Sequence, residues 1–144
     1  MVRDALDVSK YIINKCTEDN MPISDLQLQK ILFYIQLNFY RQFDCPAFNN
    51  KIYAKKYGPV VLDVYNVFKI YGAMPINLLF YDVANLFLGE EKKVVDWVIE
   101  VCRSLNPWEL VEKSHIPGGP WDMTPLEEEI TKEVIRDYAL NGIG

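Results

Sequence analysis

The sequence lacks the long apolar segment that a membrane-spanning helix requires. Its longest apolar runs are much shorter than the ~20 residues that cross a bilayer. The opening residues, MVRDALDVSK, also lack the apolar stretch of a signal peptide. We therefore expect no membrane partner and a cytoplasmic location.

Side chains that bind metals or act as nucleophiles are few. Cys16, Cys45 and Cys102 are widely spaced and form no CxxC pair, which is typical of buried thiols in a reducing compartment. His115 is the single histidine, and with scattered cysteines it provides no tetrahedral metal site. A cysteine paired with His115 would suit a thiol protease, but Cys102 falls on the apolar stripe of its predicted helix. We expect no catalytic residue, metal or cofactor.

Sequence features of nucleotide and nucleic-acid binding are also missing. There is no GxGxxG or GxxxxGK[ST] loop, and Gly118-Gly119 lies between two prolines, which indicates a turn. The net charge is −5, with a balance of +2 over residues 1–80 and −7 over residues 81–144. Affinity for nucleic acid rests on neutralising phosphates, and the two lysines before Tyr57 are too few for that. We expect no nucleic-acid partner.

The composition that remains is that of a folded globule. Half of the 144 residues are hydrophobic and 13% are aromatic, which is enough to bury a core without disulfides. No internal repeat, low-complexity tract or linker interrupts the chain. We predict one domain over residues 1–144.

A central helix is predicted for Ser24–Gln42. Ser24 and Gln27 have the spacing of a capping box at its start. The helix is apolar on most sides, and its polar residues form a narrow line: Gln27, Lys30, Tyr34, Asn38 and Arg41, with Gln29 and Gln36 on its flanks. A helix of this kind lies at the centre of a fold, with other elements packed on it.

A second helix, with a clear apolar stripe, is predicted for Pro59–Tyr71. Proline suits the first helical position and Gly72 suits the end. The stripe follows the spacing i, i+1, i+4, i+7, i+8 and i+11: Val60, Val61, Val64, Val67, Phe68 and Tyr71. Before it, the alternation in Lys51–Lys55 predicts a short strand, and we expect at most a short β-hairpin around Lys51–Tyr57.

The other predicted helices are Arg3–Cys16, Glu90–Leu105, a short one that starts at Asn106-Pro107, and a last one capped by Thr124-Pro125 with Glu127. The last helix is expected to turn four side chains to the core and to stop at Asn141-Gly142; these are Leu126, Ile130, Val134 and Tyr138. Periodicity does not decide between strand, loop and helix for residues 73–88. The expected fold is mainly α, a compact helical domain around the central helix with at most a short β-hairpin.

Three segments together resemble the Panacea domain, the SocA-like antitoxin domain of bacterial and phage genomes. Residues 26–40, LQLQKILFYIQLNFY, are similar to the family's L-x-K-L-L-Y-x-x-Q helix through Gln29, Lys30, Ile31, Leu32, Tyr34 and Gln36. Residues 57–65 look like its Y-G-P-V-V followed by V-Y. Ser114-His115 with Gly119-Pro120-Trp121 is similar to its s-H…g-P-W element. Order and approximate spacing agree over nearly the whole chain.

The resemblance implies a cytoplasmic antitoxin, a helical protein that neutralises a toxin encoded nearby by direct binding, without a cofactor. In one branch of the family the domain looks like a proteolytic adaptor, which delivers the toxin to an ATP-dependent protease. Other members are phage-associated proteins, and a hydrolase-like enzyme using His115 is a third hypothesis. The resemblance identifies neither the toxin nor an oligomeric state.

The candidate protein-binding residues surround the Gly58-Pro59 turn and the 114–121 segment: Lys56, Tyr57, Gly58, Pro59, Tyr65, His115, Pro120 and Trp121. Residues 117–121 are expected to form a stiff loop that exposes Trp121 as an anchor. In the structural alternative, Trp121 caps the core, the Tyr65 hydroxyl donates to a backbone carbonyl, and His115 holds the loop against the turn.

Overall fold

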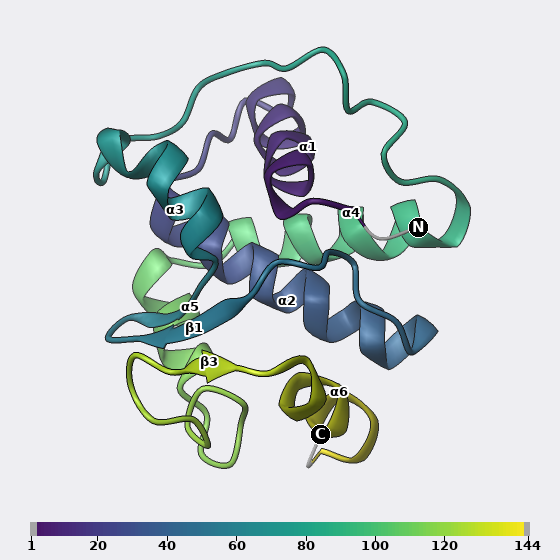
Figure 1. The fold of residues 1–144 in the computed structure, drawn as a ribbon. Coiled ribbons are helices and arrows are strands. Elements are labelled where there is room, and N and C mark those ends of the chain that lie inside the picture. The colour runs from purple at the N-terminus through teal and green to yellow at the C-terminus, as the bar shows by residue number, and fades with distance from the viewer. Residues whose placement is uncertain (1–2, 143–144) are drawn as a thin grey trace.

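The computed structural model describes residues 3–142, and these form a mainly α-helical fold with a small sheet (Figure 1). The helices are α1 (Ala5–Glu18), α2 (Asp25–Phe43), α3 (Leu62–Phe68), the 3₁₀ turn η1 (Lys69–Tyr71), α4 (Gly89–Arg103), α5 (Pro107–Ser114) and α6 (Lys132–Asn141). The strands are β1 (Ile52–Lys55), β2 (Gly58–Val60) and β3 (Glu129–Ile130). The predicted fold class is confirmed. The predicted domain also takes in residues 1–2 and 143–144, which lie outside the described residues.

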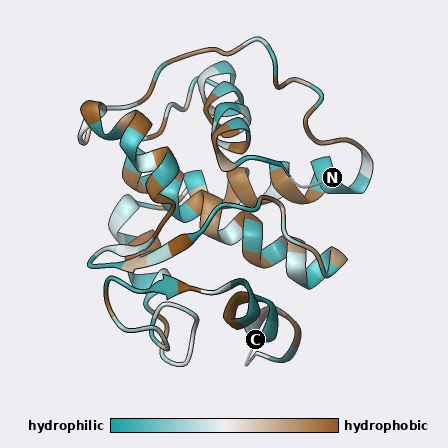
Figure 2. Ribbon diagram, viewed as in Figure 1, coloured by the Kyte–Doolittle hydropathy of each residue, from teal (hydrophilic) through white to brown (hydrophobic). Residues whose placement is uncertain are grey.

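Helix α2 is the central element, as predicted. Ser24 Oγ accepts a hydrogen bond from the Gln27 amide and Gln27 Oε1 accepts one from the Ser24 amide, which completes the capping box. Asp44, with φ of +51°, ends the helix. Helices α1, α3, α4, α5 and α6 and strand β2 all pack against α2, which Figure 1 shows crossing the middle of the molecule. In Figure 2 its hydrophobic residues lie among these neighbours.

The sheet has the order β2-β1-β3, and both pairings are antiparallel. Lys55 pairs with Gly58, so Lys56 and Tyr57 form a two-residue turn. Gly58 follows this turn with φ of +109°, a conformation that favours glycine. The predicted hairpin is therefore present, and β3 adds a strand on the other side of β1.

The prediction that Pro59 begins a helix is wrong. Pro59 lies in β2, where it pairs with Ala54, and its missing N–H is tolerated because β2 is an edge strand. Helix α3 begins only at Leu62. Its buried side follows the predicted stripe at Val64 and Phe68, whereas Val67 is 48% exposed.

The predicted start of the last helix is also wrong. The Glu127 amide donates to the Ala54 carbonyl, and the Ala54 amide donates to the Glu128 carbonyl. The backbone groups that a helix from Thr124-Pro125 would use are thus hydrogen-bonded in the sheet. Ile130 is buried within β3. Helix α6 starts after Thr131, whose Oγ1 accepts from the Val134 amide. Leu126 is exposed, while Val134 and Tyr138 pack on the core and the helix ends at Asn141, as predicted.

Residues 73–88 form neither helix nor strand and arch over α1 between η1 and α4 (Figure 1). Asn14 of α1 holds this segment through two hydrogen bonds to the Phe80 backbone, of 2.6 and 2.7 Å. Three side chains of the segment are buried: Ile76, Val83 and Phe87. The bounds of α1, α2 and α4 differ from the predicted ones by at most two residues. No helix in the described part of the chain is long and apolar enough to cross a membrane.

Gln36 joins α2 to the segment before β1. Its Nε2 donates to the Phe48 carbonyl, and its Oε1 accepts from the amides of Ala47 and Phe48. The side chain is completely buried, so these backbone groups have no access to water. Gln36 therefore stabilises the 44–50 turn from inside the core.

We predict that Gln36→Leu lowers the free energy of unfolding by about 3 kcal/mol, because buried amide and carbonyl groups lose their partner. Gln42→Leu, on an exposed position of the same helix, should change it by less than about 0.5 kcal/mol. Urea unfolding followed by circular dichroism measures both. Equal effects of the two substitutions would contradict the role assigned to Gln36.

Candidate functional site

The centre of the candidate site is a buried lysine. Lys30 lies on the polar line of α2, yet its side chain is completely buried beneath the β1–β2 turn. Its Nζ donates to the Pro59 carbonyl over 3.2 Å. One helical position earlier, Gln29 Oε1 accepts from the Val61 amide over 2.8 Å. Two neighbouring residues of α2 therefore bind the backbone on both sides of Val60.

Gly58 fits this site because it has no side chain. A Cβ atom at this position would lie 2.5 Å from Ser114 Oγ and 2.7 Å from Lys30 Cε. Ser114 is buried as well, and its hydroxyl donates to the Val111 carbonyl over 2.7 Å. The turn, α2 and the end of α5 therefore meet at Gly58.

Trp121 attaches the 114–121 segment to the same hairpin, because its Nε1 donates to the Lys55 carbonyl over 2.7 Å. The His115 and Trp121 rings stack with centroids 3.7 Å apart and an angle of 11° between the planes. His115 Nε2 is buried, and no described residue bonds to it. His115 therefore packs on Trp121 within the segment, and Trp121 holds the segment against the hairpin.

Burial changes the acid–base properties of this cluster. Loss of hydration lowers the pKa of Lys30 to about 8, although the negative charge of Asp25 acts in the opposite direction. Burial also lowers the pKa of His115, and the positive charge of Lys30 adds to this effect. His115 is therefore neutral at pH 7.

The eight predicted site residues divide by exposure. The buried or partly buried ones are Gly58, Pro59, His115, Pro120 and Trp121. The exposed ones are Lys56, Tyr57 and Tyr65. Lys56 and Tyr57 lie at the hairpin turn, with the Lys56 ammonium 5.4 Å from the Tyr57 ring centroid. Tyr65 projects from α3 and makes no hydrogen bond through its side chain within residues 3–142.

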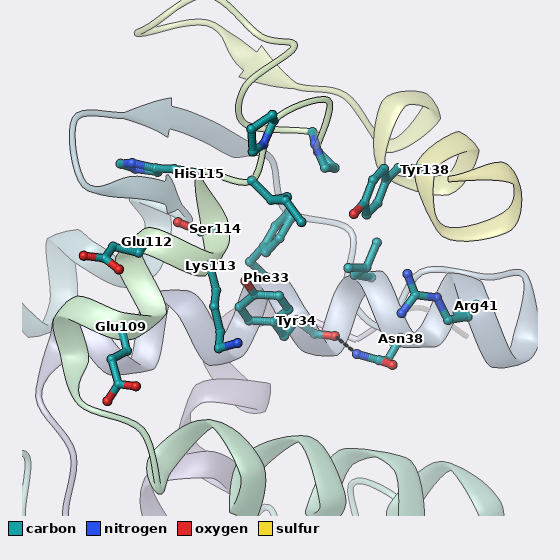
Figure 3. A pocket seen from close by; sticks show the side chains of 14 residues that line it. Phe33, Tyr34, Asn38, Arg41, Glu109, Glu112, Lys113, Ser114, His115 and Tyr138 are labelled. Carbon is teal, nitrogen blue, oxygen red and sulfur yellow. Dashed lines mark hydrogen bonds between the residues drawn. The ribbon is translucent and has the colours of Figure 1, made fainter. Parts of the chain in front are cut away.

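A groove of about 690 Å³ lies beside the cluster and was not predicted (Figure 3). Side chains from α2, α5, α6 and the 115–120 segment line it. Phe33 and Tyr34 come from α2, Lys113 and His115 from α5 and its end, and Tyr138 from α6. Its parts lie far apart in the sequence, so no local pattern marks it.

Two exposed tryptophans were also missed. Trp108, at the start of α5, is 56% exposed, and its ring meets that of Tyr57 edge to face at 5.4 Å. Trp97 of α4 is 58% exposed and borders a smaller, mainly apolar hollow of about 180 Å³. Trp97 falls off the apolar stripe of its helix, and this was the one signal in the sequence that could have marked it.

The reactive side chains of the site are buried or already hydrogen-bonded. The Lys30 amine is buried, and the Ser114 hydroxyl is bonded to its own helix. Within residues 3–142, no group of three His, Cys, Asp or Glu side chains could hold a metal ion. Burial raises the pKa of the Cys102 thiol to about 12, so it is not a thiolate at neutral pH.

We predict that Gly58→Ala lowers the free energy of unfolding by about 3 kcal/mol, since the added methyl group overlaps Ser114 and Lys30 and the backbone is strained. Gly118→Ala is the matched control, because Gly118 also has a positive φ of +80° but faces open space. It should lose only about 1 kcal/mol, from strain alone. Chemical denaturation compares the two, and similar losses would rule out close packing at Gly58.

Lys30 should also make stability depend on pH. Its pKa is about 8 in the folded chain against 10.5 without burial, so the unfolded chain binds more protons between these values and stability rises with pH there. From about pH 7 to about pH 9, the wild type should gain about 1 kcal/mol relative to Lys30→Met, which has no ionisable group at this position. Urea unfolding at both pH values tests this, and parallel pH profiles would contradict it.

Comparison of the sequence with known proteins relates this chain to one family. Residues 28–122 match the family model described as "Antitoxin SocA-like, Panacea domain". The chain is also similar to "Antitoxin SocA" of Caulobacter vibrioides (strain NA1000 / CB15N), with 28% identity over 130 residues, which is 83% of this chain and 69% of that protein. No solved structure matches.

The family match begins in α2 and ends just after Trp121. It therefore spans Lys30, the Gly58-Pro59 turn and the His115–Trp121 stack, the three parts of the buried cluster. The resemblance of the three sequence segments is thus confirmed over most of the chain. The chain belongs to the SocA-like Panacea domain family.

Proposed function

We propose that this chain is a cytoplasmic antitoxin that neutralises a protein toxin encoded nearby by direct binding, without chemistry of its own. Family membership over residues 28–122 is the observation that carries the proposal. The similar protein from Caulobacter vibrioides has the name of an antitoxin. The buried Lys30 supports a binding role, because its ammonium group contacts the Pro59 carbonyl inside the protein instead of an open cavity.

The proposed toxin-binding surface is the turn surface, which consists of Lys56, Tyr57 and Trp108. Tyr57 is 46% exposed, and its edge-to-face contact with Trp108 holds both rings in place. Exposed and ordered Trp and Tyr side chains are the residues that contribute most to protein interfaces. The Lys30 cluster fixes the hairpin from below, so the surface is held by rigid elements. An interface of standard size would bury about 1,600 Å² in total around it.

We predict that Trp108→Ala combined with Tyr57→Ala weakens toxin binding by about 30-fold or more, because two anchors are removed. The control is Tyr81→Ala, which removes a ring that is 94% exposed on the 73–88 segment. Growth on co-expression with the neighbouring gene product, and calorimetry with purified proteins, measure the effect. A neighbour that is harmless when expressed alone would contradict the antitoxin function.

The growth experiment, repeated in a strain without ATP-dependent proteases, separates neutralisation by binding from proteolytic delivery. Neutralisation by binding should persist in a strain without its ATP-dependent proteases, because the toxin is occluded and not degraded. Loss of neutralisation in that strain, with binding intact, would support the adaptor function instead.

A further inference from the structure

The groove beside the cluster has an apolar floor and ends of different charge. Phe33 and Tyr34 form its floor in Figure 3, where Lys113 extends over Tyr34 and Arg41 projects farther along α2. In Figure 3, Glu112 projects from α5 near the end where His115 lies, and Glu109 projects from the first turn of α5, away from His115. The end of the groove at Arg41 is therefore the basic one.

Two cations that line the groove, Arg41 and Lys113, are available to a ligand. Among the described residues, no carboxylate lies within ion-pair distance of either Arg41 or Lys113. Both side chains are exposed. Arg41 bonds only weakly through Nε to the Ala139 carbonyl, over 3.5 Å, which leaves its terminal nitrogens without a partner in the described chain. This contrasts with Arg136 on the neighbouring α6, which forms a two-point bridge to Asp44.

Neutral donors lie at the same end. Asn38 and Tyr138 line the groove between α2 and α6, and in Figure 3 the Tyr138 hydroxyl points toward the groove. Glu109 does not compete for the cations, because its Oε1 accepts from the Asn106 amide in the cap of α5. The cations and neutral donors can bind a carboxylate of the ligand. The aromatic floor can bind an apolar side chain that precedes this carboxylate in the ligand sequence.

The size of the groove indicates the conformation of its ligand. Its volume of about 690 Å³ lies within the range of small-ligand sites, and a helix about 10 Å across would not enter it. Glu109 and Glu112 also line the groove, so they would repel a ligand that is negatively charged along its whole length, as a nucleic-acid backbone is. An extended peptide with one acidic end fits both constraints.

We propose that this groove binds an acidic, extended segment of the toxin, with its carboxylates on Arg41 and Lys113 and an apolar side chain on Phe33 and Tyr34. The inference rests on the proposed antitoxin function and names the part of the toxin that is recognised.

The test uses the full chain and overlapping synthetic peptides that cover the toxin. Fluorescence anisotropy should identify at least one acidic segment that binds, and Arg41→Glu with Lys113→Glu should weaken its binding by about ten-fold or more. The affinity of the wild type should fall as salt is added. The control, Lys51→Glu with Lys69→Glu, makes the same charge change at exposed residues outside the groove and should bind like the wild type.

Other outcomes separate this inference from the function on which it rests. If no acidic peptide binds, or if the groove variant binds it as the wild type does, the inference is wrong even when the chain neutralises the toxin. If the neighbouring protein is harmless alone, the antitoxin function itself fails, which growth shows before any peptide is measured. If the groove variant has the same midpoint temperature of thermal unfolding as the wild type, it is correctly folded.

Discussion

The hydrogen bond from the buried Lys30 ammonium to the Pro59 carbonyl is the contact on which the arrangement of the hairpin, α2 and α5 depends. Removing a charge from water is unfavourable, so the surrounding elements must be held by contacts of their own. Gln29 holds the strand end at Val61, and Trp121 holds the other side of the hairpin at Lys55. Gly58 allows the turn to approach closely enough to close over the lysine.

Local patterns were sufficient for the helices that carry their own start and stop signals. Helix α2 was predicted to within one residue at each end, because an apolar surface and a capping box occur together there. The errors fall where a pairing partner is distant in the sequence. Gly58-Pro59 suits both a helix start and an edge strand, and only the pairing with β1 decides between them. The Thr124-Pro125 pair with Glu127 likewise has the composition of a helix cap. The Glu127 amide, however, donates a hydrogen bond to the Ala54 carbonyl in the sheet.

The sequence indicated which segments meet at the candidate site, but not which of their side chains are buried. The turn and the 114–121 segment were expected to meet, and the hydrogen bond from Trp121 to the Lys55 carbonyl shows that they do. The sequence did not decide whether Trp121 and His115 are exposed or packed, because the partner of Trp121 is a backbone carbonyl on a distant segment. The burial of Lys30 could not be predicted from the sequence either, because its partner is the Pro59 carbonyl on a distant segment. Most of the residues that resemble the family are thus buried or partly buried, while Tyr57 is exposed beside Trp108.

The short third strand has a consequence for synthesis of the chain. Strand β1 pairs on one side with its neighbour β2, but on the other side with Glu129 and Ile130 near the C-terminus. While the chain leaves the ribosome, the Ile52–Tyr53 edge stays open until residues 129 and 130 have emerged. An open edge can pair with another nascent chain. The pairing of β3 with β1 therefore removes an edge at which nascent chains could aggregate.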